Sequence, residues 1–359
     1  MAILALMVLG GFSMCSKNEV VAHEEDPWID LCGDTPILFA SRTNTPVTKA
    51  TTPLPSGTHF AVFGFYQPGD IEEHEPGTWL PFPITHTPNF MYNQEVEYEY
   101  DDELDRETYT YTPIKYWPNN AENTLTFWGY SPYTPQPAAP ATPNPMLLQV
   151  SDGERYTNQS TGIPNIKFTV TDGRTDLLIS DIEDDQTYRG GDPATGVVTL
   201  HFQHILSRID FVVKIHEDAP DGSSILLSTI KLVDVYKTAT HNQDDDWLPL
   251  SYDDETKGDL VLFSSPGGIP LDKETSPEEL TDFMVLPQAF GPGAKLQIVY
   301  DDGEEATGEV LLAGLHDGEW QKGKRYTYTV SIMTYGNPII FSASVAPWDE
   351  DDGYVNIIK

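Results

Sequence analysis

The sequence predicts an all-β protein, and three observations carry this prediction. Proline (29 residues) and glycine (27 residues) interrupt the 359-residue chain so often that long helices are disfavoured. Several short runs alternate apolar and polar residues, which is the pattern of a half-buried strand. No stretch keeps the 3.6-residue period of an amphipathic helix. Short strands separated by turn signals are typical of β-sandwiches.

Length and charge narrow the possible architectures and partners. A chain of 359 residues suits two domains of roughly 100–200 residues each. The chain has 20 Lys and Arg against 56 Asp and Glu, a net charge of −36. Such a surface repels phosphate groups, so the sequence predicts no nucleic-acid partner. With only two cysteines, a disulfide framework is excluded.

The first 15 residues have the features of a lipoprotein signal peptide. Residues 3–12 are apolar, but this run is shorter than the roughly 20 residues that span a bilayer. Cys15 follows directly and resembles the lipobox cysteine of bacterial lipoproteins, which carries acyl chains after export. The alternative is a buried structural cysteine. Residues 16–34 are acidic and unpatterned, and we interpret them as a tether.

An N-terminal β-sandwich domain is expected over residues 35–196. The run at 60–66 is rich in β-forming residues and lies between Gly57 and Pro68, which predicts a central strand. Residues 95–112 alternate on both sides of an acidic turn and predict a hairpin. Further strands are expected at 36–39, 125–130 and 176–180.

A C-terminal β-sandwich domain is expected over residues 197–359. It opens with Val198, Leu200 and Phe202 on one face, and the same period of two continues through residues 209–215. Later strands are expected at 230–236, 259–263, 283–286, 296–300, 326–332 and 339–345.

An ordered set of short motifs runs through most of the chain. The set consists of KYWP at 115–118, LTF at 125–127, DLL at 176–178, FQHILSR at 202–208, VLPQ at 285–288, WQKGKRYTY at 320–328 and VAPW at 345–348. In this order the set resembles the fimbrillin family of Bacteroidetes, the type V pilins. The resemblance implies two tandem transthyretin-like β-sandwich domains and export as an outer-membrane lipoprotein. It also implies removal of an N-terminal strand and polymerisation into an adhesive pilus, by insertion of a strand from the neighbouring subunit.

The resemblance also indicates where maturation and donation would occur. Arg42 and Lys49 are the basic residues at which a maturation protease would cut. The candidate donor strand carries Ile339, Phe341, Ala343 and Val345 on one face. Two alternatives stay open: this run is an ordinary internal strand, or the acidic tail after it is the donor.

No pattern predicts an enzyme. The acidic clusters lie in polar, turn-like stretches, and no HExxH, GxSxG or phosphate-binding loop occurs. We therefore expect no catalytic residue, metal site or cofactor, and the partners we expect are other pilus subunits, the outer membrane, and a host protein or glycan.

The alternative function is a monomeric glycan-binding surface lipoprotein that uses exposed aromatic residues, and a secreted glycoside hydrolase is a more distant one. Trp117, Trp128, Trp320 and Trp348 could stack on sugars, although core positions are more typical of such residues in sandwiches.

Overall fold

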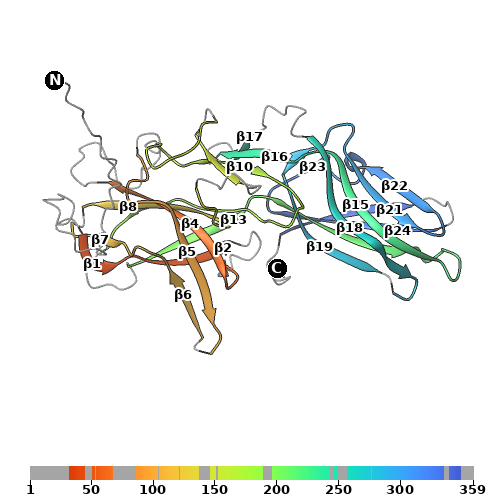
Figure 1. Ribbon diagram of the computed structural model, residues 1–359, viewed down its shortest axis with the longest axis horizontal. Helices are drawn as coiled ribbons and strands as arrows, with labels where there is room; N and C mark the ends of the chain where they lie inside the picture. Colours follow the sequence, from red (N-terminus) through yellow and green to blue (C-terminus); the bar gives the residue numbers. More distant parts are fainter. Residues whose placement is uncertain are drawn as a thin grey trace, which may run out of the picture.

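The protein is described by a computed structural model. It describes residues 32–44, 51–52, 54–67, 86–103, 105–120, 122–136, 146–150, 153–188, 196–242, 246–248, 257–275, 277–334 and 339–348. Within these ranges the structure consists of strands, with one short 3₁₀ helix, η4 (Leu312–Gly314). The predicted all-β fold with two β-sandwich units is confirmed. Figure 1 shows the strands of residues 32–131 towards one end of the molecule and those of residues 257–347 towards the other.

A nine-stranded sheet forms the N-terminal unit. Its path runs β3-β2-β13-β11-β8-β4-β5-β6, and β12 also pairs with β8. The bounds are β2 (Leu38–Asn44), β3 (Thr51–Thr52), β4 (Thr58–Gln67), β5 (Met91–Asp101), β6 (Arg106–Thr110), β8 (Thr124–Ser131), β11 (Leu178–Ser180), β12 (Glu183–Gln186) and β13 (Val197–His204). The predicted central strand is β4, and the predicted hairpin is β5 with β6. A separate pair joins β1 (Cys32–Pro36) to β7 (Tyr116–Pro118).

Both faces of this sheet are buried, which explains the nearly continuous apolar sequence of β4. Phe63 and Phe65 lie in one core cluster, and Phe60 and Val62 lie in another. The first face is covered by a four-stranded sheet of order β17-β16-β10-β9. Its strands are β9 (Met146–Gln149), β10 (Asn165–Thr169), β16 (Thr238–Asn242) and β17 (Asp246–Leu248). This sheet therefore combines strands from both halves of the sequence.

The second face is enclosed because the sheet curls until β2 and β6 meet. The backbone N–H of Ser41 in β2 donates to the hydroxyl of Tyr109 in β6 at 3.1 Å. Ile37, Phe39, Val198 and other apolar residues fill the space inside. Strand β2 thus closes a barrel-like wall around its own core cluster.

The C-terminal unit is a sandwich of two four-stranded sheets, ordered β19-β14-β24-β25 and β18-β15-β21-β22 (Figure 1). The bounds are β14 (Ser207–Ile215), β15 (Ser224–Tyr236), β18 (Lys257–Asp272), β19 (Glu278–Val285), β21 (Lys295–Asp301), β22 (Glu305–Leu311), β24 (Lys324–Ile332) and β25 (Ile340–Pro347). A short pair adds β20 (Gln288–Ala289) and β23 (Glu319–Trp320).

Strand β13 does not pair with the strands that follow it. It was expected to open the C-terminal domain, but its hydrogen-bonded neighbours are β11 and β2. The reason is that a period of two shows which face of a strand is buried, not which sheet contains it. The 197–359 unit as a folding domain stays a prediction. Likewise, residues 32–34 of the predicted tether belong to β1.

Candidate functional site

The candidate site is β2 and the groove that holds it. β2 runs parallel to β13, from Leu38 opposite Val197 to Thr43 opposite Phe202. On its other edge, among the described residues, only the two-residue strand β3 pairs with it. A strand that is bonded along one edge for most of its length can leave without disrupting a second ladder.

The side chains of β2 alternate between the core and the solvent. Ile37 and Phe39 are 0% and 3% exposed, whereas Leu38 between them is 49% exposed. The ring of Phe39 packs edge-on against Tyr111 and Phe127, with ring centroids 5.3 and 5.7 Å apart. Two large apolar side chains at roughly 1.5–3 kcal/mol each contribute about 3–6 kcal/mol gross to holding this segment.

Tyr111 fastens the start of the segment. Its hydroxyl donates to the carbonyl of Ile37 at 2.8 Å and accepts from the backbone N–H of Lys115 at 3.2 Å. Ile37 N–H in turn donates to the carbonyl of Lys115 at 2.9 Å. Burial raises the pKa of Tyr111 to about 12, so its hydroxyl keeps its proton at neutral pH.

Arg42 fastens the other end. Its Nη1 donates to Oε2 of Glu107 in β6 at 3.0 Å and to the carbonyl of Ser41 at 2.7 Å. This candidate cleavage residue therefore lies inside a paired strand rather than in a loop tip, where proteases usually cut. The second candidate, Lys49, lies outside the described residues. Which of the two is cut stays a prediction.

The predicted donor residues lie at the C-terminal edge strand. β25 pairs antiparallel with β24, from Ile340 opposite Ser331 to Pro347 opposite Lys324. Ile339, Phe341 and Ala343 are half-buried and pack against the large core cluster. Val345 follows the same period but is 48% exposed. Three of the four predicted side chains thus share a half-buried face within the subunit.

The two terminal strands carry the same pattern. Residues 36–43 are PILFASRT and residues 338–345 are PIIFSASV. With an offset of 302 positions, Ile339 corresponds to Ile37, Phe341 to Phe39 and Ala343 to Ser41. In both strands these residues form the inward set. This match was not predicted, although the Pro-Ile-x-Phe signal is present in both segments.

The tryptophans that a glycan-binding function would use lie in the interior. Trp117, Trp128, Trp320 and Trp348 are all at most 4% exposed. None of them offers a free ring face to a sugar. They are core residues, as is typical of sandwiches.

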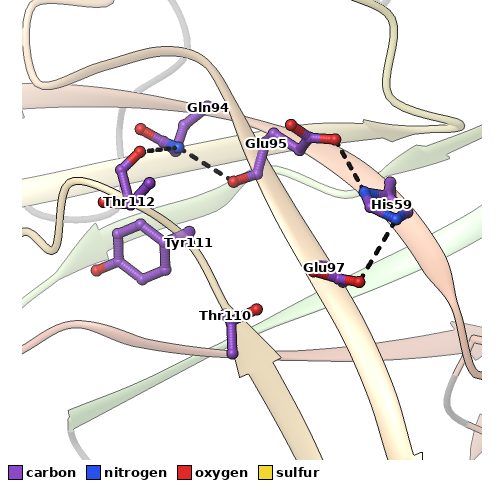
Figure 2. Close-up of a pocket in the computed structure, with 7 residues that line it drawn as sticks. All are labelled: His59, Gln94, Glu95, Glu97, Thr110, Tyr111 and Thr112. Atoms are coloured by element: carbon purple, nitrogen blue, oxygen red, sulfur yellow. Dashed lines mark hydrogen bonds and ion pairs between the residues drawn. The ribbon is translucent and has the colours of Figure 1, made fainter.

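A separate hollow of about 360 Å³ lies on the outer face of β4, β5 and β6 (Figure 2). His59 Nδ1 contacts Oε1 of Glu95 at 2.8 Å, and His59 Nε2 lies 3.7 Å from Oε1 of Glu97. Gln94 Nε2 donates to the carbonyls of Glu95 and Thr112. The polar groups of this hollow are thus largely engaged with one another.

The described part of the chain offers neither a metal site nor a membrane-spanning helix. No group of three or more His, Cys, Asp or Glu side chains is placed to hold a metal ion there. No helix in that part is long and apolar enough to cross a membrane. Cys15, the predicted lipidation residue, lies outside the described residues.

Comparisons with known proteins point to one family. The model of the family described as fimbrillin-like matches residues 48–348. A fimbrial protein from Bacteroides vulgatus has a similar structure, with a TM-score of 0.57, 20% identity, and 88% of this chain and 100% of that chain covered. Candidate cell-adhesion proteins from Bacteroides uniformis (TM-score 0.52, 17% identity, 88% and 99% covered) and Bacteroides ovatus (0.50, 13%, 88% and 98%) are also similar. At these identities the likeness shows the fold. A search of curated proteins finds no match.

Proposed function

Because the chain belongs to the fimbrillin-like family, we propose that it is a subunit of an adhesive fimbrium on the bacterial surface, joined to its neighbours by exchange of a β-strand. The family membership confirms the resemblance that the sequence motifs predict. The proposed role is structural, with other fimbrial subunits as partners. The site that serves it is the β2 groove, and the segment that fills this groove in the polymer is β25 of the next subunit.

The shared pattern of β2 and β25 carries this proposal. Ile37, Phe39 and the small Ser41 are buried in this groove, and Ile339, Phe341 and the small Ala343 match them in spacing and size, so the groove would accept them as well. In strand addition, the main chain supplies affinity and the alternate side chains supply fit. The incoming strand would run parallel to β13, as β2 does.

Cleavage after Arg42 or Lys49 would free β2 to leave, and its groove would then be vacant. Loss of β2 leaves the edge of β13 unpaired and exposes the core cluster around Phe60 and Phe202. A donor strand would bury Ile339 and Phe341 there for about 3–6 kcal/mol gross, and each ladder bond would add ~0.5–1.5 kcal/mol net. The joined subunits would then separate slowly, which suits a surface fibre.

Attachment to the cell is the second part of the proposal. After export, Cys15 would carry the acyl chains that anchor the chain to the outer membrane, with the acidic residues 16–31 as a tether. Two or more acyl chains anchor stably where one does not. Cleavage after Arg42 or Lys49 would separate the subunit from Cys15, so this anchor would hold the untrimmed chain, whose groove β2 still fills.

The direct test of function is assembly after trimming. Purified chain is treated with a protease specific for Arg and Lys, and its oligomers are compared with and without boiling in detergent. The proposal predicts a ladder of oligomers that boiling collapses to the trimmed monomer. The same chain left untrimmed should stay monomeric, because β2 still fills its groove.

A matched pair of variants shows that β25 makes the ladder. Phe341→Asp would place an unpaired carboxylate where Phe39 is buried, so it should abolish the ladder. Ser342→Asp alters the outward face of the same strand and should leave the ladder intact. If Phe341→Asp assembled as well as the parent, another segment, such as the acidic tail, would be the donor.

A further inference from the structure

The C-terminal end of β25 is fastened to the N-terminal unit. Trp348 follows β25 directly, is 4% exposed, and stacks on the ring of His204 with centroids 4.0 Å apart and planes at 19°. His204 is the last residue of β13, and its Nδ1 contacts Oδ2 of Asp176 at 2.7 Å. The backbone N–H of Trp348 donates to the carbonyl of Gly323 at 3.1 Å. Trp348 is thus enclosed by groups from both units.

The middle of β25 is held more weakly. Ile340, Ser342, Ser344 and Ala346 face solvent, and among the described residues β24 is the only strand that pairs with β25. Edge strands that lack a second partner open more easily than central strands. The Trp348 end is therefore the point at which detachment of β25 meets the most resistance.

The stack is not reproduced when β25 fills a β2 groove. By the shared pattern, the position that corresponds to Trp348 is residue 46, which is proline. Ile339, Phe341 and Ala343 are half-buried in their own subunit and would replace side chains that are at most 3% exposed, so their burial favours donation. A contact that opposes donation must therefore lie elsewhere on this segment. A two-state equilibrium shifts only with contacts that differ between its states. The contact between Trp348 and His204 is such a difference.

We infer that the contact between His204 and Trp348 controls the donation of β25: it holds β25 in its own subunit, and its loss favours donation to a neighbour. The donated state is the one in the proposed function, so this inference rests on it. His204 acts as a positioning residue: Asp176 fixes its ring, and the ring holds Trp348. While the stack is closed, the free subunit keeps its donor strand and does not join prematurely.

The test measures how often β25 opens in the full chain. Cys15 and Cys32 are replaced by serine, and Ala343→Cys places a thiol on the half-buried face of β25. This thiol is half-buried, so it reacts with a maleimide faster when β25 lifts. Trp348→Ala should speed its labelling by roughly tenfold or more, which is the effect of losing a buried aromatic pair of about 1.4 kcal/mol.

Matched variants separate opening of β25 from general unfolding. Ala294→Cys places a thiol 2% exposed elsewhere in the same sandwich, and Trp348→Ala should leave its labelling rate unchanged. Trp348→Phe keeps an aromatic ring over His204 and should restore slow labelling at position 343. If Trp348→Ala also speeds labelling at position 294, the test uses Trp348→Leu instead. Leucine keeps an apolar side chain at this position but cannot stack on His204.

Two readouts distinguish this inference from the proposed function. Unchanged labelling at position 343 in Trp348→Ala and Trp348→Leu, with position 294 protected, would overturn the inference even if trimmed parent chain forms the ladder. Faster labelling at position 343, together with a ladder that grows faster after trimming, supports both. Faster labelling at position 343, with no oligomer ladder after trimming, would show that the stack of Trp348 on His204 holds β25. It would count against strand donation.

Discussion

The hydroxyl of Tyr111 donates a 2.8 Å hydrogen bond to the carbonyl of Ile37, which ties the residue after β6 to the start of the N-terminal strand. The same hydroxyl accepts the backbone N–H of Lys115, so it serves two main-chain groups. Tyr111→Phe leaves both buried groups short of a partner, and we expect it to lower the free energy of unfolding by about 1–3 kcal/mol. Urea denaturation measures this change. Tyr100→Phe, on the exposed part of β5, should change stability by less than about 0.5 kcal/mol.

Substitutions of Phe39 and Leu38 test which face of β2 packs into the groove and stabilises the strand there. Phe39→Ala removes a ring that packs on Tyr111 and Phe127 and should cost about 3–5 kcal/mol in the free energy of unfolding. Leu38→Ala, a change on the exposed face, should cost less than about 0.5 kcal/mol. Equal losses would mean that β2 does not sit in its groove with the alternation described.

Lys115 gives the stability of the N-terminal unit a defined pH dependence. Burial lowers its pKa from 10.5 to about 8. Between these values the unfolded chain binds more protons than the folded chain, so the contribution of Lys115 to stability rises with pH. Below pH 8 the cost of the buried charge is fully present. Lys115→Met should therefore gain most over the parent at pH 7, and the gain should shrink by pH 10. A difference that stays constant across this range would contradict the shifted pKa.

Gly308 in β22 forms a notch for Ile339. A Cβ atom at position 308 would overlap Cδ1 of Ile339, so the absence of a side chain lets the start of β25 close over the sandwich. Gly308→Ala should destabilise the C-terminal unit, and adding Ile339→Ala should recover part of the loss. A double-mutant cycle measures this coupling, for which we expect about 0.5–3 kcal/mol. Additive losses would show that the two residues act independently.

Cys15 is the predicted attachment point for lipid. Cells that express the chain should incorporate labelled palmitate into it, and Cys15→Ser should abolish that incorporation. Cys32→Ser is the matched control and should leave the label in place. Equal labelling of Cys15→Ser and the parent would contradict a lipid anchor at this residue.

The sequence predicted where strands occur better than it predicted which strands pair with each other. The apolar run of β4 and the hairpin of β5 and β6 carry local signals, because burial and turns leave their pattern within a few residues. The parallel pairing of β13 with β2 joins segments far apart in the chain, and alternation alone does not specify a partner. Strands β10 and β16 were not predicted, so their pairing was missed as well.

Of the two parts of the candidate site, the sequence predicted the proposed donor strand but not the groove around β2. The shared face of Ile339, Phe341 and Ala343 was predicted from alternation, and these side chains do pack against one core cluster. That they are donated stays a prediction. The groove was not identified, because Tyr111 and Glu107 meet β2 only after the sheet has curled. That curl depends on the whole sheet and has no local signal. The exposure of Val345 could not be predicted either, because the alternation in the sequence continues through this residue.

The register of the proposed exchange can be tested with engineered disulfides. Ala40 lies opposite Thr199 in the parallel ladder, and Ser342 corresponds to Ala40 in the shared pattern. A disulfide needs Cα atoms within about 7 Å, which neighbouring strands satisfy at matched positions but not two residues out of register. The pairing of Thr199→Cys with Ser342→Cys is therefore specific to this register, and Ser344→Cys is the matched control.

The most direct measurement is disulfide formation between two trimmed chains that lack the native cysteines, one with Thr199→Cys and the other with Ser342→Cys. If β25 of one subunit replaces β2 of the next, oxidation should give the cross-linked dimer in high yield, and Ser344→Cys should give little. If Ser342→Cys gave no cross-link while Val355→Cys in the C-terminal tail did, β25 would not be the strand that fills the groove.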